Sequence, residues 1–223
     1  MTVTTADQRT RRGVFVALEG GDGAGKSTQA TLLRDWLVAR GRRVVVTREP
    51  GGTQVGQQIR QVLLHGDHVA PRADALLFAA DRGQHVETLV RPALERGHDV
   101  ITDRYLDSSV AYQGAGRDLG ADEVRRLSLW AVRDLLPDLT VLLDVSSTTG
   151  RSRRGETHDR LEREPDGFHE RVRRHFLDLA AAGPSRYLVL DAGRPEHELA
   201  RAIQERMSAL LAAREPEPEP EPV

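Results

Sequence analysis

A glycine-rich segment near the start of the chain has the residue types needed to hold a row of phosphate groups. It reads Gly20-Gly21-Asp22-Gly23-Ala24-Gly25-Lys26-Ser27-Thr28 and fits the pattern G-x-x-x-x-G-K-[ST] completely. Glycines allow the backbone to curl until consecutive N–H groups face one concavity, where they can hold phosphate oxygens. Lys26 would then reach the β- and γ-phosphates of ATP, and Ser27 would offer its hydroxyl to Mg²⁺. The segment predicts a loop that binds a nucleoside triphosphate.

Lys26 is the only lysine among the 32 Lys and Arg residues of the chain. A compact ammonium group suits a crowded phosphate site, and the wide guanidinium of arginine replaces it poorly. A dinucleotide-binding G-x-G-x-x-G pattern is excluded, because counting from Gly21 or Gly23 puts Lys26 or Thr28 in place of the third glycine. GTPases that read the base with N-K-x-D are also excluded, because the chain has no second lysine.

Arginines and an aromatic residue recur where a second, anionic substrate would have to bind. Arg48 follows one apolar run, Asp103-Arg104-Tyr105 follows another, and Phe78 stands shortly before Asp81-Arg82. Arginine can bind a phosphate group through two parallel N–H bonds, which makes it a suitable residue for an acceptor site. This pattern favours a kinase for a small molecule. A regulatory or motor ATPase stays as an alternative, with Asp144 as the carboxylate for Mg²⁺ and water.

Apolar runs and amphipathic stretches alternate along the chain, which is typical of β-α-β units in a parallel sheet. We expect strands over residues 14–18, 44–47, 100–102, 140–145 and 187–190. We expect helices over residues 26–40, 54–64, 72–96, 122–135, 168–182 and 196–213. The predicted fold is α/β of the P-loop NTPase type: a five-stranded parallel sheet with helices on both faces and ligands at the carboxyl ends of the strands.

One domain is expected over residues 13–213, between disordered tails at 1–12 and 214–223. The second tail alternates Glu and Pro, so it can neither bury side chains nor continue a helix. Without its four glutamates the net charge rises from −2 to +2, which gives no reason to expect nucleic acid as a partner. The chain has no cysteine, no apolar stretch long enough to cross a membrane and no secretory signal at its start. We therefore expect a cytoplasmic protein with no membrane partner.

Taken together, the motifs resemble those of bacterial thymidylate kinases from about residue 14 to residue 210. Besides the phosphate loop, the resemblance rests on the order and spacing of segments 47–53, 78–82, 103–105, 108–114 and 137–145. It implies the reaction ATP + dTMP → ADP + dTDP with Mg²⁺, a step in dTTP synthesis. It also implies a homodimer built from helix faces, including the helix expected at 72–96.

The resemblance also assigns residues to the acceptor site. Phe78 would stack on the thymine ring, Arg82 would hydrogen-bond the base, and Arg104 would hold the phosphate of dTMP. Tyr112 would crowd the 2′ position and so favour deoxyribose. The other substrate-binding candidates are Arg48, Glu49, Pro50, Ser109 and Gln113. Asp22 would lie near the sugar and phosphate of the acceptor, and Asp103 would join Ser27 near Mg²⁺.

Further catalytic cations are expected from an arginine-rich lid at about residues 150–164. One branch of the resembled family carries an arginine inside the phosphate loop, where this chain has Gly23, and the other branch supplies arginines from a closing lid. Fixed cations would neutralise the charge that develops on the transferring phosphoryl group. On composition alone, the same stretch would also fit a solvated linker. The predicted catalytic residues are Lys26, Asp22, Arg104, Arg153 and Arg160.

Other interpretations of the same residues stay open. Another nucleotide or deoxynucleoside kinase of this fold could use Glu49 as the base that takes a hydroxyl proton. By periodicity Phe78 would be a core residue, and Arg82 could form an exposed ion pair with its neighbour Asp81. The histidines at positions 65 and 68 have a spacing that metal sites can use.

Overall fold

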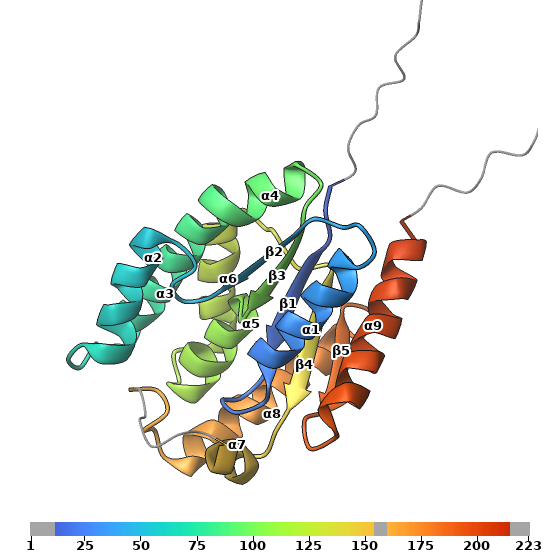
Figure 1. Ribbon diagram of the computed structural model, residues 1–223. Helices are drawn as coiled ribbons and strands as arrows, with labels where there is room; N and C mark the ends of the chain where they lie inside the picture. The colour runs from blue at the N-terminus through green and yellow to red at the C-terminus, as the bar shows by residue number, and fades with distance from the viewer. Residues whose placement is uncertain (1–11, 154–159, 215–223) are drawn as a thin grey trace, which may run out of the picture.

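The computed structural model describes residues 12–153 and 160–214 of the chain (Figure 1). The tails expected at 1–12 and 214–223 lie outside the described residues, apart from Arg12 and Arg214. These two arginines both pair with the carboxylate of Asp138. The described part of the chain therefore extends one residue beyond each of the domain limits expected from the sequence.

Five parallel strands form the sheet, in the order β2-β3-β1-β4-β5. Their bounds are β1 (Phe15–Glu19), β2 (Val44–Arg48), β3 (Asp99–Asp103), β4 (Leu139–Asp144) and β5 (Tyr187–Asp191). Leu18 and Arg48 both align with Asp103, so β1, β2 and β3 end at the same edge of the sheet. This edge therefore gathers the loops on which the sequence places the candidate site. The predicted α/β fold with five parallel strands is confirmed.

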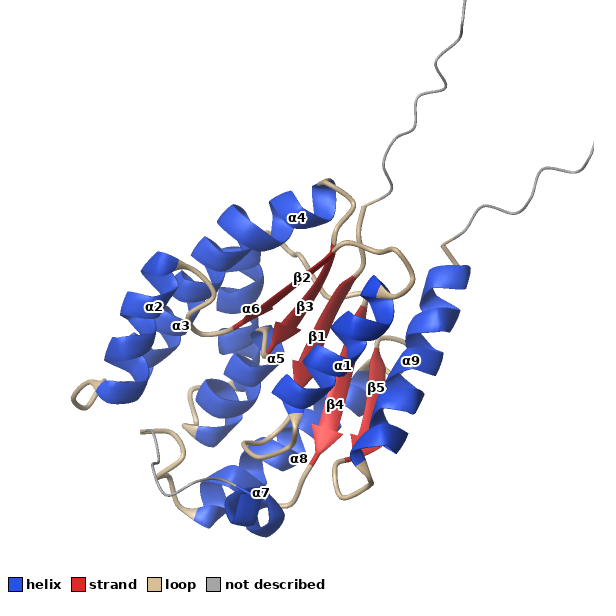
Figure 2. Cartoon of the chain, viewed as in Figure 1, coloured by secondary structure: helices blue, strands red, loops and turns tan. Residues whose placement is uncertain are grey.

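Helices cover both faces of the sheet (Figure 2). On one face, α1 (Lys26–Val38) and α9 (Glu196–Ala212) pack against Val16 and Leu18 of the central strand. The alternate residues Phe15 and Ala17 face the other side, as the two-residue period of a strand requires. The other helices include α2 (Gln54–Arg60), α3 (Pro71–His85), α4 (Arg91–Glu95), α6 (Ala121–Val132) and α8 (Asp166–Ala182). All the strands and helices predicted from the sequence are present, with shifts of a few residues at their ends.

Two of the expected helices contain wide, π-helical turns. The helix expected at 54–64 continues from α2 into η1 (Gln61–His65), and the one expected at 72–96 comprises α3, η2 (Val86–Val90) and α4. The turn η2 ends two residues before Pro92, which has no N–H group to donate to the carbonyl of Thr88 within that turn. The missing hydrogen bond gives a physical reason for the irregular turn at this point.

Two helical segments were not expected from the sequence. The first, α5 (Leu106–Ser109) with η3 (Val110–Gly116), follows β3 and is buried on nearly every side. A segment buried all round lacks the amphipathic period by which a helix is recognised. The second, α7 (Ser147–Arg153), overlaps the stretch that we expected to form the lid. Among the described residues, no helix is long and apolar enough to cross a membrane.

Candidate active site

A cavity of about 400 Å³ lies at the edge where β1, β2 and β3 end. Its walls come from the phosphate loop with the start of α1, the loop after β2, helix α3, and the segment from Asp103 through η3. The predicted residues that line it are Asp22, Gly23, Gly25, Lys26, Ser27, Thr28, Arg48, Glu49, Pro50, Phe78, Arg82, Asp103, Arg104, Ser109, Tyr112 and Gln113. The fold thus joins the predicted phosphate site and the predicted acceptor site in one space.

The phosphate loop has the tight backbone that its glycines allow. Gly20 and Gly23 have positive φ angles of 133° and 78°, which a side chain would oppose. The loop is also closely packed, because a Cβ atom on Gly20 would lie 2.3 Å from the carbonyl oxygen of Leu143. Gly21 and Ala24 belong to the same turn but do not line the cavity, and neither does Gly20. These three residues therefore determine the backbone shape of the loop. The backbone N–H groups of the loop are the groups that can bind phosphate.

Lys26 turns its ammonium group back onto this loop. Its Nζ donates to the carbonyl oxygens of Gly20, at 3.1 Å, and Gly21, at 2.8 Å. Burial lowers the pKa of Lys26, and the nearby positive charge of Arg104 lowers it further. A bound polyphosphate would supply the negative charge that favours the protonated amine at this position.

The residue types next to Lys26 fit a magnesium ion. Ser27 donates its hydroxyl hydrogen to Oδ2 of Asp103 at 2.6 Å, which brings two oxygen atoms from α1 and β3 together. Mg²⁺ prefers oxygen ligands and usually keeps several waters, so a site of one carboxylate and one hydroxyl beside a triphosphate suits it. No cluster of three or more His, Cys, Asp or Glu side chains able to hold a metal occurs in the described part of the chain. The histidine pair at 65 and 68 therefore belongs to no such cluster.

Arg104 holds its guanidinium between the phosphate loop and η3. The NH1 group donates to the Gly20 carbonyl at 3.0 Å and to Oγ of Ser108 at 3.1 Å. The NH2 group pairs with Asp22 and donates to the Tyr112 hydroxyl at 3.4 Å. Burial raises the pKa of Tyr112, so its phenol stays neutral and can donate to Asp22, at 3.3 Å. Three residues predicted from separate motifs thus meet at one point of the cavity.

Phe78 is both a core residue and a wall of the cavity. Its side chain is 7% exposed and belongs to the apolar cluster that contains Tyr112, Phe168 and Phe176. Tyr112 packs edge-to-face on these two phenylalanines, with ring centroids 6.0 and 6.3 Å apart. A rigid aromatic wall of this kind can support a flat ligand ring. Phe78 is therefore a core residue, as its periodicity predicts, and it also lines the cavity, whereas its stacking on a thymine ring stays a prediction.

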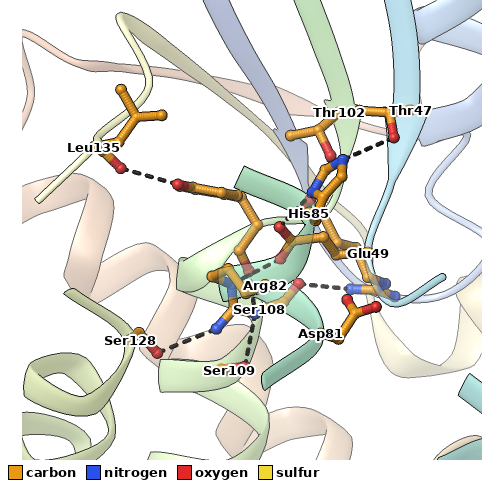
Figure 3. Close-up of polar contacts among 12 residues, drawn as sticks. Thr47, Glu49, Asp81, Arg82, His85, Thr102, Ser108, Ser109, Ser128 and Leu135 are labelled. Atoms are coloured by element: carbon orange, nitrogen blue, oxygen red, sulfur yellow. Dashed lines mark hydrogen bonds and ion pairs between the residues drawn. The ribbon is translucent and has the colours of Figure 1, made fainter. Parts of the chain in front are cut away.

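Arg82 lies in a buried network instead of an exposed ion pair (Figure 3). Its Nε donates to Oε2 of Glu49 at 2.7 Å, and its NH2 group donates to Oγ of Ser109 at 2.9 Å. The other oxygen of Glu49 is 2.8 Å from Nδ1 of His85. The interpretation of Arg82 as the exposed partner of Asp81 is wrong, because Arg82 is buried and Oε2 of Glu49 is the carboxylate oxygen that pairs with it. A carboxylate occupied in this way is poorly placed to act as the base of a deoxynucleoside kinase.

Asp81 occupies a separate buried position. Its Oδ1 accepts a hydrogen bond from the N–H group of Gly51 at 3.0 Å, and its Oδ2 has no partner among the described residues. Burial raises the pKa of Asp81 to about 6, and the nearby charge of Glu49 contributes to this rise. Asp81 therefore helps to hold the loop after β2 but carries an unfavourable buried charge.

The structure places the two predicted lid arginines away from the cavity walls. Arg153 donates from NH1 to the carbonyl oxygen of Ala192 at 2.8 Å. Arg160 donates from Nε to the carbonyl oxygen of Leu63 at 2.8 Å and pairs with the buried Asp74. Residues 154–159 of the expected lid lie outside the described residues. Neither arginine touches the cavity in this arrangement, whereas Leu161 and Glu162 line it.

Asp144, the candidate carboxylate of a regulatory ATPase, is engaged elsewhere. Its two oxygens accept hydrogen bonds from Nε and NH2 of Arg173 on α8, at 2.6 and 2.9 Å. It does not line the cavity. The main sequence argument for a regulatory or motor ATPase was that Asp144 could bind Mg²⁺ and water, and this position of Asp144 removes that argument.

Sequence reasoning missed several residues at or beside the site. Those that line the cavity are Arg60, Leu64, Tyr105, Ser108, Leu161 and Glu162. Glu19 and His85 are fully buried behind it, and both hydrogen-bond residues that line it. A charged residue at the end of an apolar strand, directly before the glycine-rich loop, was the one signal that could have pointed to Glu19.

Comparisons with known proteins agree with this geometry. The sequence profile of the thymidylate kinase family matches residues 18–203. A thymidylate kinase of Clavibacter michiganensis subsp. michiganensis is 62% identical over 205 residues, which cover 90% of this chain and 97% of that protein. One from Bifidobacterium longum is 54% identical, over 89% of this chain and 98% of its own. The crystal structure of thymidylate kinase from Ehrlichia chaffeensis superposes with a TM-score of 0.73 at 30% identity, covering 90% of this chain and 99% of that one.

Proposed function

The chain belongs to the thymidylate kinase family, and we propose that its cavity is where the γ-phosphoryl group of ATP passes to dTMP. The enzyme is a phosphotransferase that forms dTDP and ADP, a step in dTTP synthesis. One observation carries the assignment of the site: the phosphate loop and the predicted acceptor residues line the same cavity. Two substrates that must exchange a phosphoryl group need such a common space.

We assign the acceptor end of the cavity to the thymine base. Phe78 supplies an aromatic wall for the ring, and Arg82 with Ser109 and Gln113 supplies polar groups for the base edge. The four bonds from Arg82 to protein groups use four of its five N–H donors, which leaves one on NH1 for a ligand. Arg48, Glu49 and Pro50 close this end as part of the loop after β2. Tyr112 stands beside the sugar, where its ring leaves less room for a 2′-hydroxyl.

The transfer itself is a displacement at the γ-phosphorus of ATP. An oxygen of the dTMP phosphate bonds to that phosphorus while the bond to the β–γ bridging oxygen breaks. The attacking phosphate is already ionised, so the reaction needs no strong base. Lys26 and Arg104 hold the two phosphate chains in place and neutralise their charge. We assign Arg153 and Arg160 to the same task once both substrates are bound, after they leave their present partners Ala192 and Asp74.

Ser27 and Asp103 would hold a magnesium ion in this site. A magnesium ion bound there with ATP would supply positive charge to neutralise the phosphate groups. Asp22, which already pairs with Arg104, lies where it can contact the sugar and phosphate of dTMP.

We further propose that the enzyme is a homodimer that works in the cytoplasm, where ATP and dTMP are found. The support for the dimer is an exposed apolar surface on α3 and α6, formed by Leu76, Leu127 and Trp130. Leu76 on α3 is 57% exposed, and Trp130 on α6 is 78% exposed. Leu127, also on α6, is half-buried and lines a small cavity together with Leu76. A soluble monomer rarely leaves such a surface uncovered.

An acceptor screen tests the function directly. Release of ADP is measured with ATP, Mg²⁺ and each of dTMP, dUMP, UMP, CMP, AMP, GMP and thymidine. We expect the highest kcat/KM with dTMP and no turnover with thymidine, since both Glu49 oxygens are already engaged. Turnover with a different acceptor would keep the phosphate loop assignment and overturn the base-site assignments. Release of ADP without any acceptor would instead support a regulatory ATPase.

A further inference from the structure

Glu19 is a buried carboxylate at the end of the central strand, directly before the phosphate loop. Its side chain is 0% exposed and does not line the cavity. Its Oε1 accepts hydrogen bonds from the backbone N–H groups of Tyr105, at 2.8 Å, and Ser108, at 3.2 Å. Its Oε2 accepts a bond of 2.6 Å from the Ser108 hydroxyl. Burying a charged group is unfavourable, so three bonds to one short segment call for a reason other than packing.

The segment that Glu19 holds contains the backbone of Arg104. Arg104 has a φ angle of 70°, in the left-handed region that a residue with a side chain adopts only under strain. Its own N–H donates to the carbonyl of Leu18 at 2.9 Å, and its carbonyl accepts the Thr102 hydroxyl at 2.9 Å. The next N–H group, that of Tyr105, is the one that bonds Glu19. Glu19 therefore secures one end of a strained turn that aims the arginine into the cavity.

The Ser108 hydroxyl links Glu19 to the guanidinium of Arg104. A hydroxyl has one hydrogen to donate and lone pairs to accept with. An ionised carboxylate can only accept, so the Ser108 hydrogen must point at Glu19. The lone pairs of Ser108 are then left for NH1 of Arg104, at 3.1 Å. We call these two hydrogen bonds, from Arg104 to Ser108 and from Ser108 to Glu19, the relay. The negative charge on Glu19 fixes which atom donates in each of them.

We propose that Glu19 is a positioning residue for the acceptor phosphate: its carboxylate orients Arg104 through the Ser108 hydroxyl and through the backbone that follows Arg104. The inference rests on the proposed role of Arg104 in holding the phosphate of dTMP. Glu19 lines no part of the cavity, and its hydrogen bonds go to the segment that follows Arg104, so its main effect should fall on the binding and alignment of dTMP. ATP, which the phosphate loop and Lys26 hold, is expected to be little affected.

The relay depends on the protonation of Glu19, because a protonated carboxyl carries a hydrogen of its own. Burial raises the pKa of Glu19 to about 7, and the neighbouring Asp107 on α5 raises it as well, against the lowering effect of Arg104. Lys26 on α1 and Tyr187 on β5 also interact with its charge. As the pH falls through about 7, Glu19 takes up a proton and the Ser108 hydroxyl can turn toward Arg104. The KM for dTMP should then rise.

The substitution Glu19→Gln tests the relay with little change in shape. Its amide oxygen can still accept the two backbone bonds, but its NH₂ group would donate to Ser108 and displace Arg104 from it. At pH 8 we expect the KM for dTMP to rise about tenfold, equivalent to about 1.4 kcal/mol, with the KM for ATP changed less than twofold. Ser108→Ala should have a similar effect, and the double variant should show no further loss beyond that of Ser108→Ala, because both changes break one relay.

A matched control is Asp99→Asn at the opposite end of β3. Asp99 is also a buried carboxylate, and it accepts a backbone bond from Val14 at 2.8 Å and pairs with Arg42. It is remote from the cavity, so its loss should lower stability and leave both KM values unchanged. If Glu19 were merely structural, Glu19→Gln would behave in the same way as Asp99→Asn.

The pH profile of the KM for dTMP and the variant Arg104→Ala distinguish a failure of the relay from a failure of the proposed role of Arg104. The dTMP phosphate itself titrates at about pH 6, so the effect of Glu19 is the part of the KM profile that Glu19→Gln abolishes. If Arg104→Ala raises the KM for dTMP but neither Glu19→Gln nor Ser108→Ala does, the relay is overturned and the role of Arg104 stands. If Arg104→Ala leaves dTMP kinetics unchanged, the acceptor role of Arg104 in the proposed function fails. Should Glu19→Gln fold poorly, the pH profile of Ser108→Ala decides the role of Glu19: the rise in the KM for dTMP as the pH falls through about 7 should be lost with this hydroxyl, and a rise equal to that of the wild type would overturn the relay.

Discussion

Arg104 connects several parts of the predicted site, because its bonds reach Gly20, Asp22, Ser108 and Tyr112. These contacts use the planar fork of a guanidinium, with each terminal nitrogen serving two acceptors. Lysine would keep the positive charge but could not span the same acceptors. At the scale of single residues, the geometry of the cation therefore matters as much as its charge.

We expect Arg104→Lys to lower kcat/KM for dTMP by about 10²-fold, as the loss of a well-placed cationic donor commonly does. The KM for ATP should change less than threefold, because Lys26 and the loop backbone hold that nucleotide. Steady-state kinetics with each substrate varied in turn give both values. A variant with wild-type kinetics toward dTMP would remove Arg104 from the acceptor site.

Asp81 gives a second test at this scale, through stability. Its pKa rises in the folded state from 3.8 to about 6, so the native protein binds more protons than the unfolded chain between these pH values. Stability contributed by this group is therefore lost as the pH rises from about 4 to about 6. Asp81→Asn keeps an acceptor for the Gly51 N–H and removes the buried charge. We expect the variant to be more stable than the wild type by on the order of 1–2 kcal/mol at pH 8.

Urea unfolding at pH 8 and at pH 4 measures this difference, which should largely vanish at the lower pH. Asp99→Asn offers a useful contrast, since Asp99 is buried but paired with Arg42. Asp99→Asn should destabilise the protein at pH 8, because it leaves the guanidinium of Arg42 without its charged partner. If Asp81→Asn destabilised the protein as much as Asp99→Asn does, the prediction would be wrong. The negative charge of Asp81 would then be stabilised by its surroundings more than its hydrogen bonds indicate.

At the scale of elements, the two arginines that we propose for the chemical step stand at the end of α7 and in the segment before α8. Arg153 at the end of α7 binds the Ala192 carbonyl, and Arg160 binds Asp74 on α3. Arg153 is thereby held to the residue that follows β5, and Arg160 is held to α3. Closure over bound substrates would have to exchange these contacts for contacts with phosphate oxygens.

Removing either arginine should therefore act on the chemical step. We expect Arg153→Ala and Arg160→Ala to lower kcat by about 10²-fold, with smaller changes in the KM for dTMP, since the cations are needed most when charge develops in the transition state. Arg201→Ala, an exposed arginine on α9, is the matched control and should stay within twofold of the wild type. An unchanged kcat for one of the two lid variants would show that its present contact is structural only.

At the scale of the whole molecule, the apolar surface formed by Leu76, Leu127 and Trp130 faces solvent in a single copy of the chain. A second copy of the chain would cover it. A small apolar cavity of about 210 Å³ lies beside Leu76 and Leu127, between α3 and α6. The same helix α3 carries Phe78 and Arg82 on its inner side. A dimer formed on its outer side would therefore stiffen the helix that supports the base site.

We expect Leu76→Glu to shift the protein from dimer to monomer, because it places a charge on this apolar surface, where a dimer would bury it. Sedimentation equilibrium over a range of protein concentrations measures the change. Val38→Glu is the matched control, since Val38 is 53% exposed on α1 at a distance in the fold from α3 and should leave the oligomeric state unchanged. A wild-type protein that sediments as a monomer would contradict the proposed dimer.

The sequence by itself determined the features that depend on local chemistry. The glycine-rich loop was readable because positive φ angles and close packing at Gly20 and Gly23 restrict these positions to glycine. The five parallel strands followed from short apolar runs separated by amphipathic stretches. In a parallel sheet the strand ends share one edge, so the motifs after those strands had to meet there.

Only the tertiary structure decided which polar groups are partners. Asp81 is adjacent to Arg82 in the chain, yet Glu49 is the carboxylate that pairs with it, 33 positions away. Likewise Glu19 acts on a segment 86 to 89 positions later, and Arg160 binds Asp74 86 positions earlier. Side-chain pairs of this kind depend on burial and on the register between strands and helices, and a single sequence records neither.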